Sequence, residues 1–172
     1  IHQYTARELD RHPEPRLFKS HAPFDRRYGR VIYIVRDPRD VAVSFYHFRT
    51  KRGIVEADYP IGEHVEEFLD GMHVYGTWAE HVGGWLGARE HRSDFHWLRY
   101  EDMQDDALAE LRDACRFLEL DVSSETLRRA VTKSSADRMR RLEREADENK
   151  PVILQGDDDK PFIRKAESGG WR

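Results

Sequence analysis

Arg36 and Ser44 are the first residues whose types and spacing could do chemistry. Arg36 ends one apolar run and Ser44 lies within a second, almost wholly apolar run, in the segment 31–48, VIYIVRDPRDVAVSFYHF. A guanidinium can bind a phosphate through two parallel N–H bonds, and a nearby hydroxyl adds a further donor. We therefore expect a phosphate group between Arg36 and Ser44. The structural alternative is that Arg36 pairs with an acid such as Asp40, and Ser44 bonds the carbonyl four residues back.

The elements that flank this pair suit an anion. Residues 30–35 have the pattern of a short buried parallel strand, and Asp37 and Pro38 are typical of a helix N-cap and first helical position. The helix is predicted to run to about Arg52 and to end at Gly53. Open α/β sheets bind ligands beyond the carboxyl ends of their strands, and helix N-termini attract anions. Ser44 is expected to be buried, where an unpaired hydroxyl would cost about 1–3 kcal/mol.

Strands alternate with helices along the rest of the chain. Besides 30–35, strands are predicted at 16–21 and 95–100, and helices at 63–70, 73–88, 105–119, 123–132 and 134–147. The tail 149–172 has two prolines, several glycines and an acidic run, which is typical of a loop. This order predicts an α/β fold with a parallel sheet. Three strands are few for such a sheet, so we expect that part of the chain is missing.

Composition narrows the class of protein. A chain of 172 residues fits one domain with its own core, and its net charge of -4 argues against a nucleic-acid partner. The single cysteine, Cys115, excludes an internal disulfide framework, and no stretch has the pattern of a membrane span or signal peptide. A cytoplasmic location is therefore expected. No histidine spacing indicates a metal site. The chain begins at Ile1 rather than Met, which favours a fragment of a longer protein.

The segment 31–48 resembles the 3′-phosphate-binding segment of the cytosolic-type sulfotransferases, which use 3′-phosphoadenosine 5′-phosphosulfate (PAPS). Further similar segments follow in the family's order: LFKSHAPF at 17–24, YGTWAEHVGGW at 75–85, FHWLRYEDM at 95–103, AVTKSSADRM at 130–139 and FIRKAESGGWR at 162–172. The resemblance implies a P-loop-like three-layer α/β fold with a parallel sheet, incomplete at its N-terminal side. Residues 1–172 are then expected to form a single sulfotransferase domain that is truncated at its N-terminus.

The resemblance also implies roles for individual residues that bind the nucleotide. Arg36 and Ser44 would bind its 3′-phosphate together with the cationic tail segment, and the adenine would be contacted from three further positions. The implied nucleotide-binding residues are Arg36, Ser44, Tyr100, Ser134, Ser135, Arg164, Lys165 and Ala166. Two positions depart from the family. Ala166 replaces a glycine, and a Cβ is unfavourable in a left-handed conformation. Ala136 replaces an aromatic residue that would stack on the adenine.

Two residues of the segment 17–24 could carry the reaction. A neutral imidazole, with an ordinary pKa of about 6.5, can take a proton from an acceptor hydroxyl at neutral pH. The family's base matches His21, and Lys19 would stabilise the charge that builds up on the leaving phosphate. Because residues two apart on a strand share a face, the predicted strand at 16–21 would place both side chains together. Trp78 and His81 are expected in the core.

The family's 5′-phosphosulfate loop, a glycine-rich Lys-Ser/Thr segment between a strand and a helix, has no match in residues 1–172. We expect a PAPS-dependent sulfotransferase that moves a sulfuryl group to a hydroxyl or amine of a small-molecule acceptor and releases 3′-phosphoadenosine 5′-phosphate (PAP), without a metal. The alternative is a non-catalytic nucleotide-binding or scaffold relative that lacks the loop. A nucleotide kinase is disfavoured, because no Mg²⁺-binding carboxylate is found at a strand end. The acceptor and the oligomeric state are not indicated by the sequence.

Overall fold

The computed structural model describes residues 11, 16–71, 75–145, 157 and 160–172. Within these residues, two strands, β1 (Val31–Val35) and β2 (Phe95–Arg99), pair in parallel from Val31 opposite Phe95 to Val35 opposite Arg99. The helices are α2 (Pro38–Lys51), α3 (Ile61–Leu69), α4 (Trp78–Arg89), α5 (Tyr100–Asp105), α6 (Ala107–Phe117), α7 (Ser124–Lys133) and α8 (Ala136–Glu145). The predicted α/β class with a parallel sheet is confirmed.

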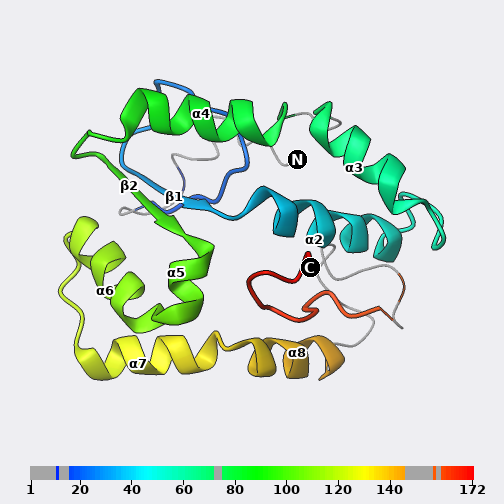
Figure 1. The fold of residues 1–172 in the computed structure, drawn as a ribbon. Coiled ribbons are helices and arrows are strands. Elements are labelled where there is room, and N and C mark those ends of the chain that lie inside the picture. The colour runs from blue at the N-terminus through cyan, green and yellow to red at the C-terminus, as the bar shows by residue number, and fades with distance from the viewer. Residues whose placement is uncertain (1–10, 12–15, 72–74, 146–156, 158–159) are drawn as a thin grey trace.

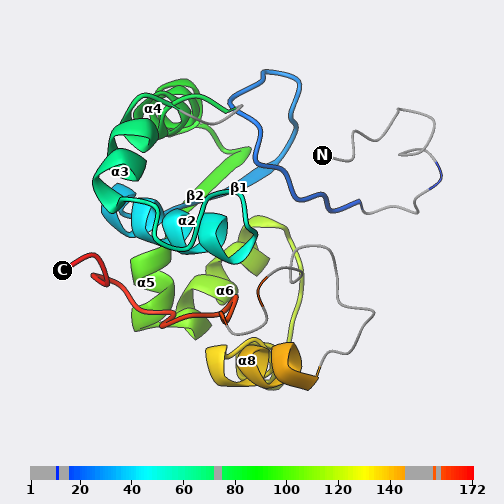
Figure 2. The ribbon, with the colours of Figure 1, turned by 90° about the vertical axis from the view of Figure 1, so that its right-hand side faces the viewer.

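The elements lie in three layers, with the sheet in the middle (Figures 1 and 2). Helix α4 covers one face, where Trp85 stacks on Phe95 at 6.0 Å and on Tyr33 at 5.6 Å between ring centroids. Helix α6 covers the other face, where Phe117 stacks on His96 at 5.4 Å. Because side chains alternate between the two faces of a strand, these aromatic contacts fix which side of the sheet each helix covers.

Helix α2 begins and ends where the sequence predicts. The Asp37 side chain accepts from the backbone N–H of Arg39, and Pro38 occupies the first helical position. The C-cap is Arg52, and Gly53 follows with φ +62°, a left-handed conformation that glycine adopts without steric cost. The helix leaves the carboxyl end of β1 with its N-terminus at the sheet, as the anion-site argument requires (Figure 1).

The strand predicted at 16–21 is wrong. Residues 16–25 have neither helical nor strand structure, and positions 17–21 are exposed. Lys19 and His21 therefore do not share a strand face. Within the described residues the sheet has two strands, which pair only with each other. A segment with a β-type pattern becomes a strand only when a neighbouring strand forms hydrogen bonds with its backbone groups. Here no described strand does so, and side chains of α4 bond the carbonyls of His21 and Ala22 instead.

The other element boundaries differ from the predicted ones by a few residues, and one short helix was missed. Tyr100 does not end β2 but begins α5, whose six residues are too few for a clear helical period. The tail has no helix or strand over 160–172, as expected, and runs between α2 and α8 (Figure 1). The expected loop at 149–156 and 158–159 lies outside the described residues. In the described part of the chain, no helix has the length and apolarity needed to cross a membrane.

Candidate functional site

Arg36 lies just beyond the carboxyl end of β1 and is held on several sides. Its guanidinium lies over the ring of Tyr100, 4.4 Å from the centroid, and its Nη2 donates to the carbonyl of Glu167 at 3.0 Å. Nη2 also lies 3.9 Å from a carboxylate oxygen of Asp40. The Nε atom is buried and has no hydrogen-bond partner among the described residues. Since an unpaired buried donor is costly, this N–H is available to an acceptor that enters the site.

Ser44 is exposed, so the expectation of a buried hydroxyl is wrong. Its polar neighbours on the helix surface are Asp40 and His47, four residues before and three after, while Val41 and Phe48 are its apolar neighbours. The hydroxyl has no hydrogen bond to any described residue, and the predicted alternative, a bond to the carbonyl four residues back, is not formed. Thr132 on α7 does make such a bond, to the carbonyl of Arg128 at 2.9 Å. The Ser44 hydroxyl is therefore available as a donor.

The tail crosses α2 along the surface that carries Ser44. Arg164 Nη1 donates to His47 Nε2 at 2.6 Å, one turn after Ser44. One turn before Ser44, the buried carboxylate of Asp40 accepts from the backbone N–H groups of Gly169 at 2.7 Å and Trp171 at 3.2 Å. The tail thus runs antiparallel to α2, and the predicted clamp Arg164, Lys165 and Ala166 is brought toward Ser44 although it is more than a hundred residues away in sequence.

Helix α8 fixes the backbone of the tail from the other side. The Arg140 guanidinium donates to the carbonyls of Ile163 at 3.2 Å, Arg164 at 3.0 Å and Lys165 at 2.7 Å. The carboxylate of Glu143 accepts from the N–H groups of Phe162 and of Ile163, the latter at 3.1 Å. Helix α2 contributes Lys51, whose ammonium donates to the carbonyls of Asp157, at 3.0 Å, and of Lys160. The tail is therefore held in place by protein groups alone.

Ala166 adopts a left-handed backbone conformation with φ +54°. This conformation is the one in which glycine is favoured, and the sequence resemblance places a glycine here. A left-handed residue turns its backbone N–H away from the direction that an extended chain would give it, which is how short nests of N–H groups form around anions. The substitution by alanine retains the conformation and adds a strained Cβ.

The electrostatics of the cluster favour an anion. The guanidiniums of Arg36 and Arg164 lie near Asp40 and His47, the residues of α2 one turn before and after Ser44. The pKa of His47 is lowered by its burial, then by the charges of Arg164 and Lys160. At the helix N-terminus, the hydrogen bond from Arg39 lowers the pKa of Asp37 to about 2. When His47 is neutral, its Nε2 can accept a hydrogen bond from Arg164. The ring then orients the guanidinium without placing a second positive charge beside it.

Of the residues expected at the adenine, Tyr100 alone touches this cluster, through the ring face that Arg36 covers. Ser134 is the C-cap of α7, and Ser135 joins α7 to α8. Both are exposed, and no contact within the described residues joins either of them to Arg36. Their predicted role therefore rests on the resemblance, while the structure places them at one helix junction.

His21 and Lys19 lie in the segment 16–25, in which the carbonyls of His21 and Ala22 are bonded by side chains of α4. The backbone carbonyl of His21 accepts from His81 Nε2 at 3.2 Å. Partial burial lowers the pKa of the His21 imidazole, and the charges of Lys19 and then His81 lower it further. The imidazole is therefore neutral at neutral pH, as a base requires. The Lys19 charge reaches His21 even though the two are not on a strand.

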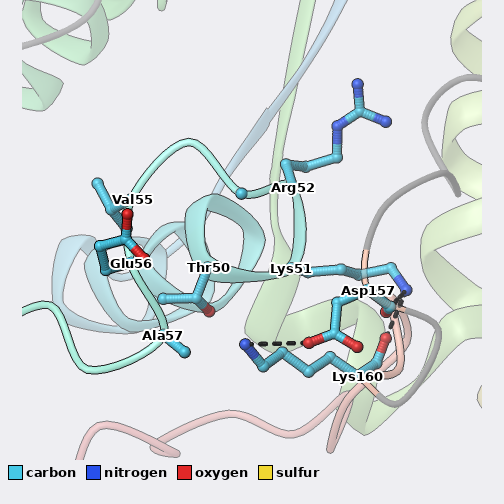
Figure 3. Close-up of a pocket in the computed structure, with 9 residues that line it drawn as sticks. Thr50, Lys51, Arg52, Val55, Glu56, Ala57, Asp157 and Lys160 are labelled. Carbon is cyan, nitrogen blue, oxygen red and sulfur yellow. Dashed lines mark hydrogen bonds and ion pairs between the residues drawn. The ribbon is translucent and has the colours of Figure 1, made fainter.

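A cavity of about 400 Å³ opens at the other end of α2 (Figure 3). Charged side chains dominate its wall, and these already pair: Lys160 Nζ lies 3.2 Å from a carboxylate oxygen of Asp157. No residue that the sequence predicts for the site lines this cavity. Among the described residues, no group of three His, Cys, Asp or Glu side chains is arranged to hold a metal ion.

Sequence reasoning missed several residues that build the site. The sequence prediction gave Asp40, His47 and Arg140 no role in holding the tail. Their signal was weak because each bonds to the tail, whose position no sequence pattern reveals. Trp78 and His81 were placed in the core, yet the indole of Trp78 donates to the carbonyl of Arg36 at 3.2 Å and His81 holds the His21 carbonyl.

Comparison with known proteins identifies the fold and the family. The sulfotransferase domain family matches residues 2–172. The amine sulfotransferase of Oryctolagus cuniculus is 32% identical over 184 residues, covering 99% of this chain and 60% of that protein. The crystal structure of mouse sulfotransferase SULT7A1 complexed with PAP superposes with a TM-score of 0.67 at 28% identity, over 81% of this chain and 50% of that one. Retinol dehydratase in complex with androsterone and inactive cofactor PAP gives 0.69 at 26% identity, over 82% and 41%.

In this chain the strand β1 leads directly into the N-terminus of α2, and guanidinium groups lie near that point. The chain is therefore an α/β protein with a candidate anion site. Since the family match runs over nearly the whole sequence, the chain belongs to the sulfotransferase family. The chain spans about 60% of the length of the curated relatives it matches.

Proposed function

We propose that this chain binds PAPS and its product PAP through the 3′-phosphate and takes part in sulfuryl transfer to a small-molecule acceptor. The observation that carries the proposal is the convergence of Arg36, Ser44 and the tail segment 164–166 on one surface of α2. These groups come from distant parts of the chain, and family membership supports a nucleotide phosphate as the ligand that they would bind together.

The groups present fit a phosphate dianion. The Arg36 Nε is buried and unpaired among the described residues, and the Ser44 hydroxyl is free there, so two donors await an acceptor. Arg164 and Lys165 add positive charge from the tail, and the N-terminus of α2 adds its dipole. Charge-assisted bonds of this kind are about twice as strong as neutral ones. The Cβ of Ala166 is the one feature that fits less well, because it stands where the family has none.

PAPS supplies the activated sulfuryl group when it is bound. His21, neutral at neutral pH because its pKa is lowered, accepts the proton of the attacking hydroxyl or amine. Lys19 places a positive charge near the same centre, where it stabilises the charge that builds up in the transition state. The relatives include an amine sulfotransferase and a 3-beta-hydroxysteroid sulfotransferase, which supports an amine or hydroxyl acceptor for this chain.

We further propose that residues 1–172 belong to a single sulfotransferase domain, because the family match continues from 2 to 172 without a break. The free Cys115 fits a reducing compartment such as the cytoplasm. No role for a metal is proposed.

Nucleotide binding tests the proposal directly on this chain. Isothermal titration with PAP, 5′-AMP and Mg²⁺-ATP should give the tightest binding for PAP, since only PAP carries the 3′-phosphate. Arg36→Ala should reduce PAP affinity at least tenfold, while the matched surface variant Arg128→Ala should leave it unchanged. Equal binding of PAP and 5′-AMP, or a preference for Mg²⁺-ATP, would refute the proposal. In the full-length protein, binding of PAP without sulfate transfer from PAPS to any hydroxyl or amine would favour the non-catalytic alternative.

A further inference from the structure

One face of α4 holds the segment that carries His21 by its backbone carbonyls. His81 Nε2 donates to the carbonyls of His21 at 3.2 Å and Ala22 at 3.1 Å, and the indole of Trp85 donates to that of Ala22 at 3.3 Å. One turn on, the Arg89 guanidinium donates to the carbonyls of Gly29, at 2.6 Å, and of Tyr28. These donors are spaced four residues apart, so they form a single row along the helix.

His81 differs from the other two donors because its second nitrogen is also bound. The hydroxyl of Tyr33, on β1, lies 2.9 Å from His81 Nδ1. Carbonyl oxygens only accept, so Nε2 carries a proton, and in the neutral form of the ring Nδ1 then accepts from the Tyr33 hydroxyl. Burial raises the pKa of Tyr33 to about 12, so its hydroxyl retains the proton that it donates. Tyr33 thereby fixes both the tautomer and the orientation of His81.

We infer that His81, oriented by Tyr33, is a positioning residue for the base His21 in the proposed sulfuryl transfer. The inference rests on the proposed function for the role of His21 and goes beyond it in naming what holds the base. The segment 16–25 has no strand partner, so the peptide of His21 is fixed by side-chain donors rather than by a sheet. The bond from His81 is made to the carbonyl of the base residue itself.

The contacts of His81 differ from those of Trp85 and Arg89, the other two donors of α4. Trp85 stacks on Tyr33 and Phe95, and Arg89 bonds the far end of the segment, so both stabilise the fold wherever the base points. His81 joins the sheet to the carbonyl of His21 through two hydrogen bonds and one ring. Displacement of a catalytic group by about 1 Å can reduce turnover a hundredfold, so such a connection matters for rate more than for stability.

The test compares His81→Leu, which loses both bonds, with His81→Gln, whose amide can still donate to the carbonyls. His91→Leu, an exposed histidine beyond the end of α4, is the matched control, and Tyr33→Phe removes only the hydroxyl. The readouts are the rate at which diethyl pyrocarbonate modifies His21, followed by peptide mass spectrometry, PAP affinity, and kcat and KM with PAPS and an acceptor.

His81→Leu and Tyr33→Phe should each change the rate of His21 modification several-fold and lower kcat about tenfold, with PAP affinity unchanged. His81→Gln should restore most of both, and His91→Leu should match the parent protein. If His81→Leu folds, as judged by its thermal transition, and leaves both His21 modification and kcat unchanged, the inference is wrong. If the parent protein does not bind PAP, the proposed function is wrong, whatever the His21 modification rates show.

Discussion

Replacement of Ala166 by glycine should stabilise the protein, because the residue is held in a left-handed conformation. With φ +54°, an L-residue other than glycine incurs about 1–2 kcal/mol of steric strain. Glycine removes that strain but gives the unfolded chain more freedom, which costs about 0.4–1 kcal/mol. The net gain in the free energy of unfolding is then about 1 kcal/mol. For a domain of this size that corresponds to an increase in Tm of about 2–4 °C.

The reverse substitution at a matched position provides the control. Gly53 has φ +62°, close to that of Ala166, and an added Cβ would meet no atom within 4 Å. Gly53→Ala should therefore lower Tm by about as much as Ala166→Gly raises it. Position 53 lies at the end of α2 away from the clamp, so its substitution isolates the backbone effect from any effect on the nucleotide site.

The same variants test whether the tail is arranged before the nucleotide binds. Because Arg140 and Asp40 hold the tail backbone on both sides of Ala166, the strain is present with and without ligand. Differential scanning fluorimetry should give the same increase in Tm for Ala166→Gly in the absence of PAP and at saturating PAP. A gain seen only with PAP would mean that the left-handed conformation forms on binding. An unchanged or lower Tm, with Gly53→Ala behaving as expected, would refute the assigned conformation.

Three further predictions concern other parts of the chain. Asp40→Asn should lower the free energy of unfolding by about 1–3 kcal/mol, because the new amide group cannot accept from both tail N–H groups. PAP affinity should fall about tenfold, because the tail that carries Arg164 and Lys165 is then held less firmly beside α2; equal affinity by titration would contradict this. The pKa of His21, followed by NMR, should lie below 6.5 and rise in Lys19→Met, since the neighbouring charge that disfavours the imidazolium is removed; no rise would exclude contact between the two. His64→Leu should lower Tm without affecting PAP affinity, because the fully buried imidazole bonds the Ala42 carbonyl and Arg49, each at 2.9 Å; an unchanged Tm would be the contrary result.

Local sequence signals predicted the framework of the site because they act within a few residues. The N-cap of α2 forms from Asp37 and Pro38, and its end from Gly53, with no help from distant parts of the chain. The parallel pairing of β1 and β2 follows from two short apolar runs separated by helices. The strand at 16–21 failed for the opposite reason. Its pattern favours a strand, but pairing depends on a neighbouring strand, and none of the described strands pairs with it; at its end, His81 of α4 bonds the His21 carbonyl instead.

The exposure of Ser44 was also predicted wrongly, because the prediction relied on the residues adjacent to it in sequence. Its sequence neighbours are apolar, which predicts burial, but a helix surface is built from residues three and four apart. Those residues are Asp40, Val41, His47 and Phe48, of which Asp40 and His47 bond the tail. Ser44 therefore has polar as well as apolar neighbours on the surface of α2, and the sequence alone does not show that the tail binds beside it.

The bonds that hold the tail explain why its sequence alone does not predict its position. Arg140, Glu143, Lys51 and Asp40 bond carbonyl and N–H groups, which every tail sequence would offer. Much of the information that places the tail thus lies in α2 and α8, and the bond from Arg164 to His47 adds a contribution from the tail itself. Residues 160–172 supply what the backbone cannot, namely the charges of Arg164 and Lys165. It follows that substitutions in α8 can weaken the proposed phosphate site, although no residue of α8 is assigned to it, since Arg140 determines where the Arg164 and Lys165 backbones lie.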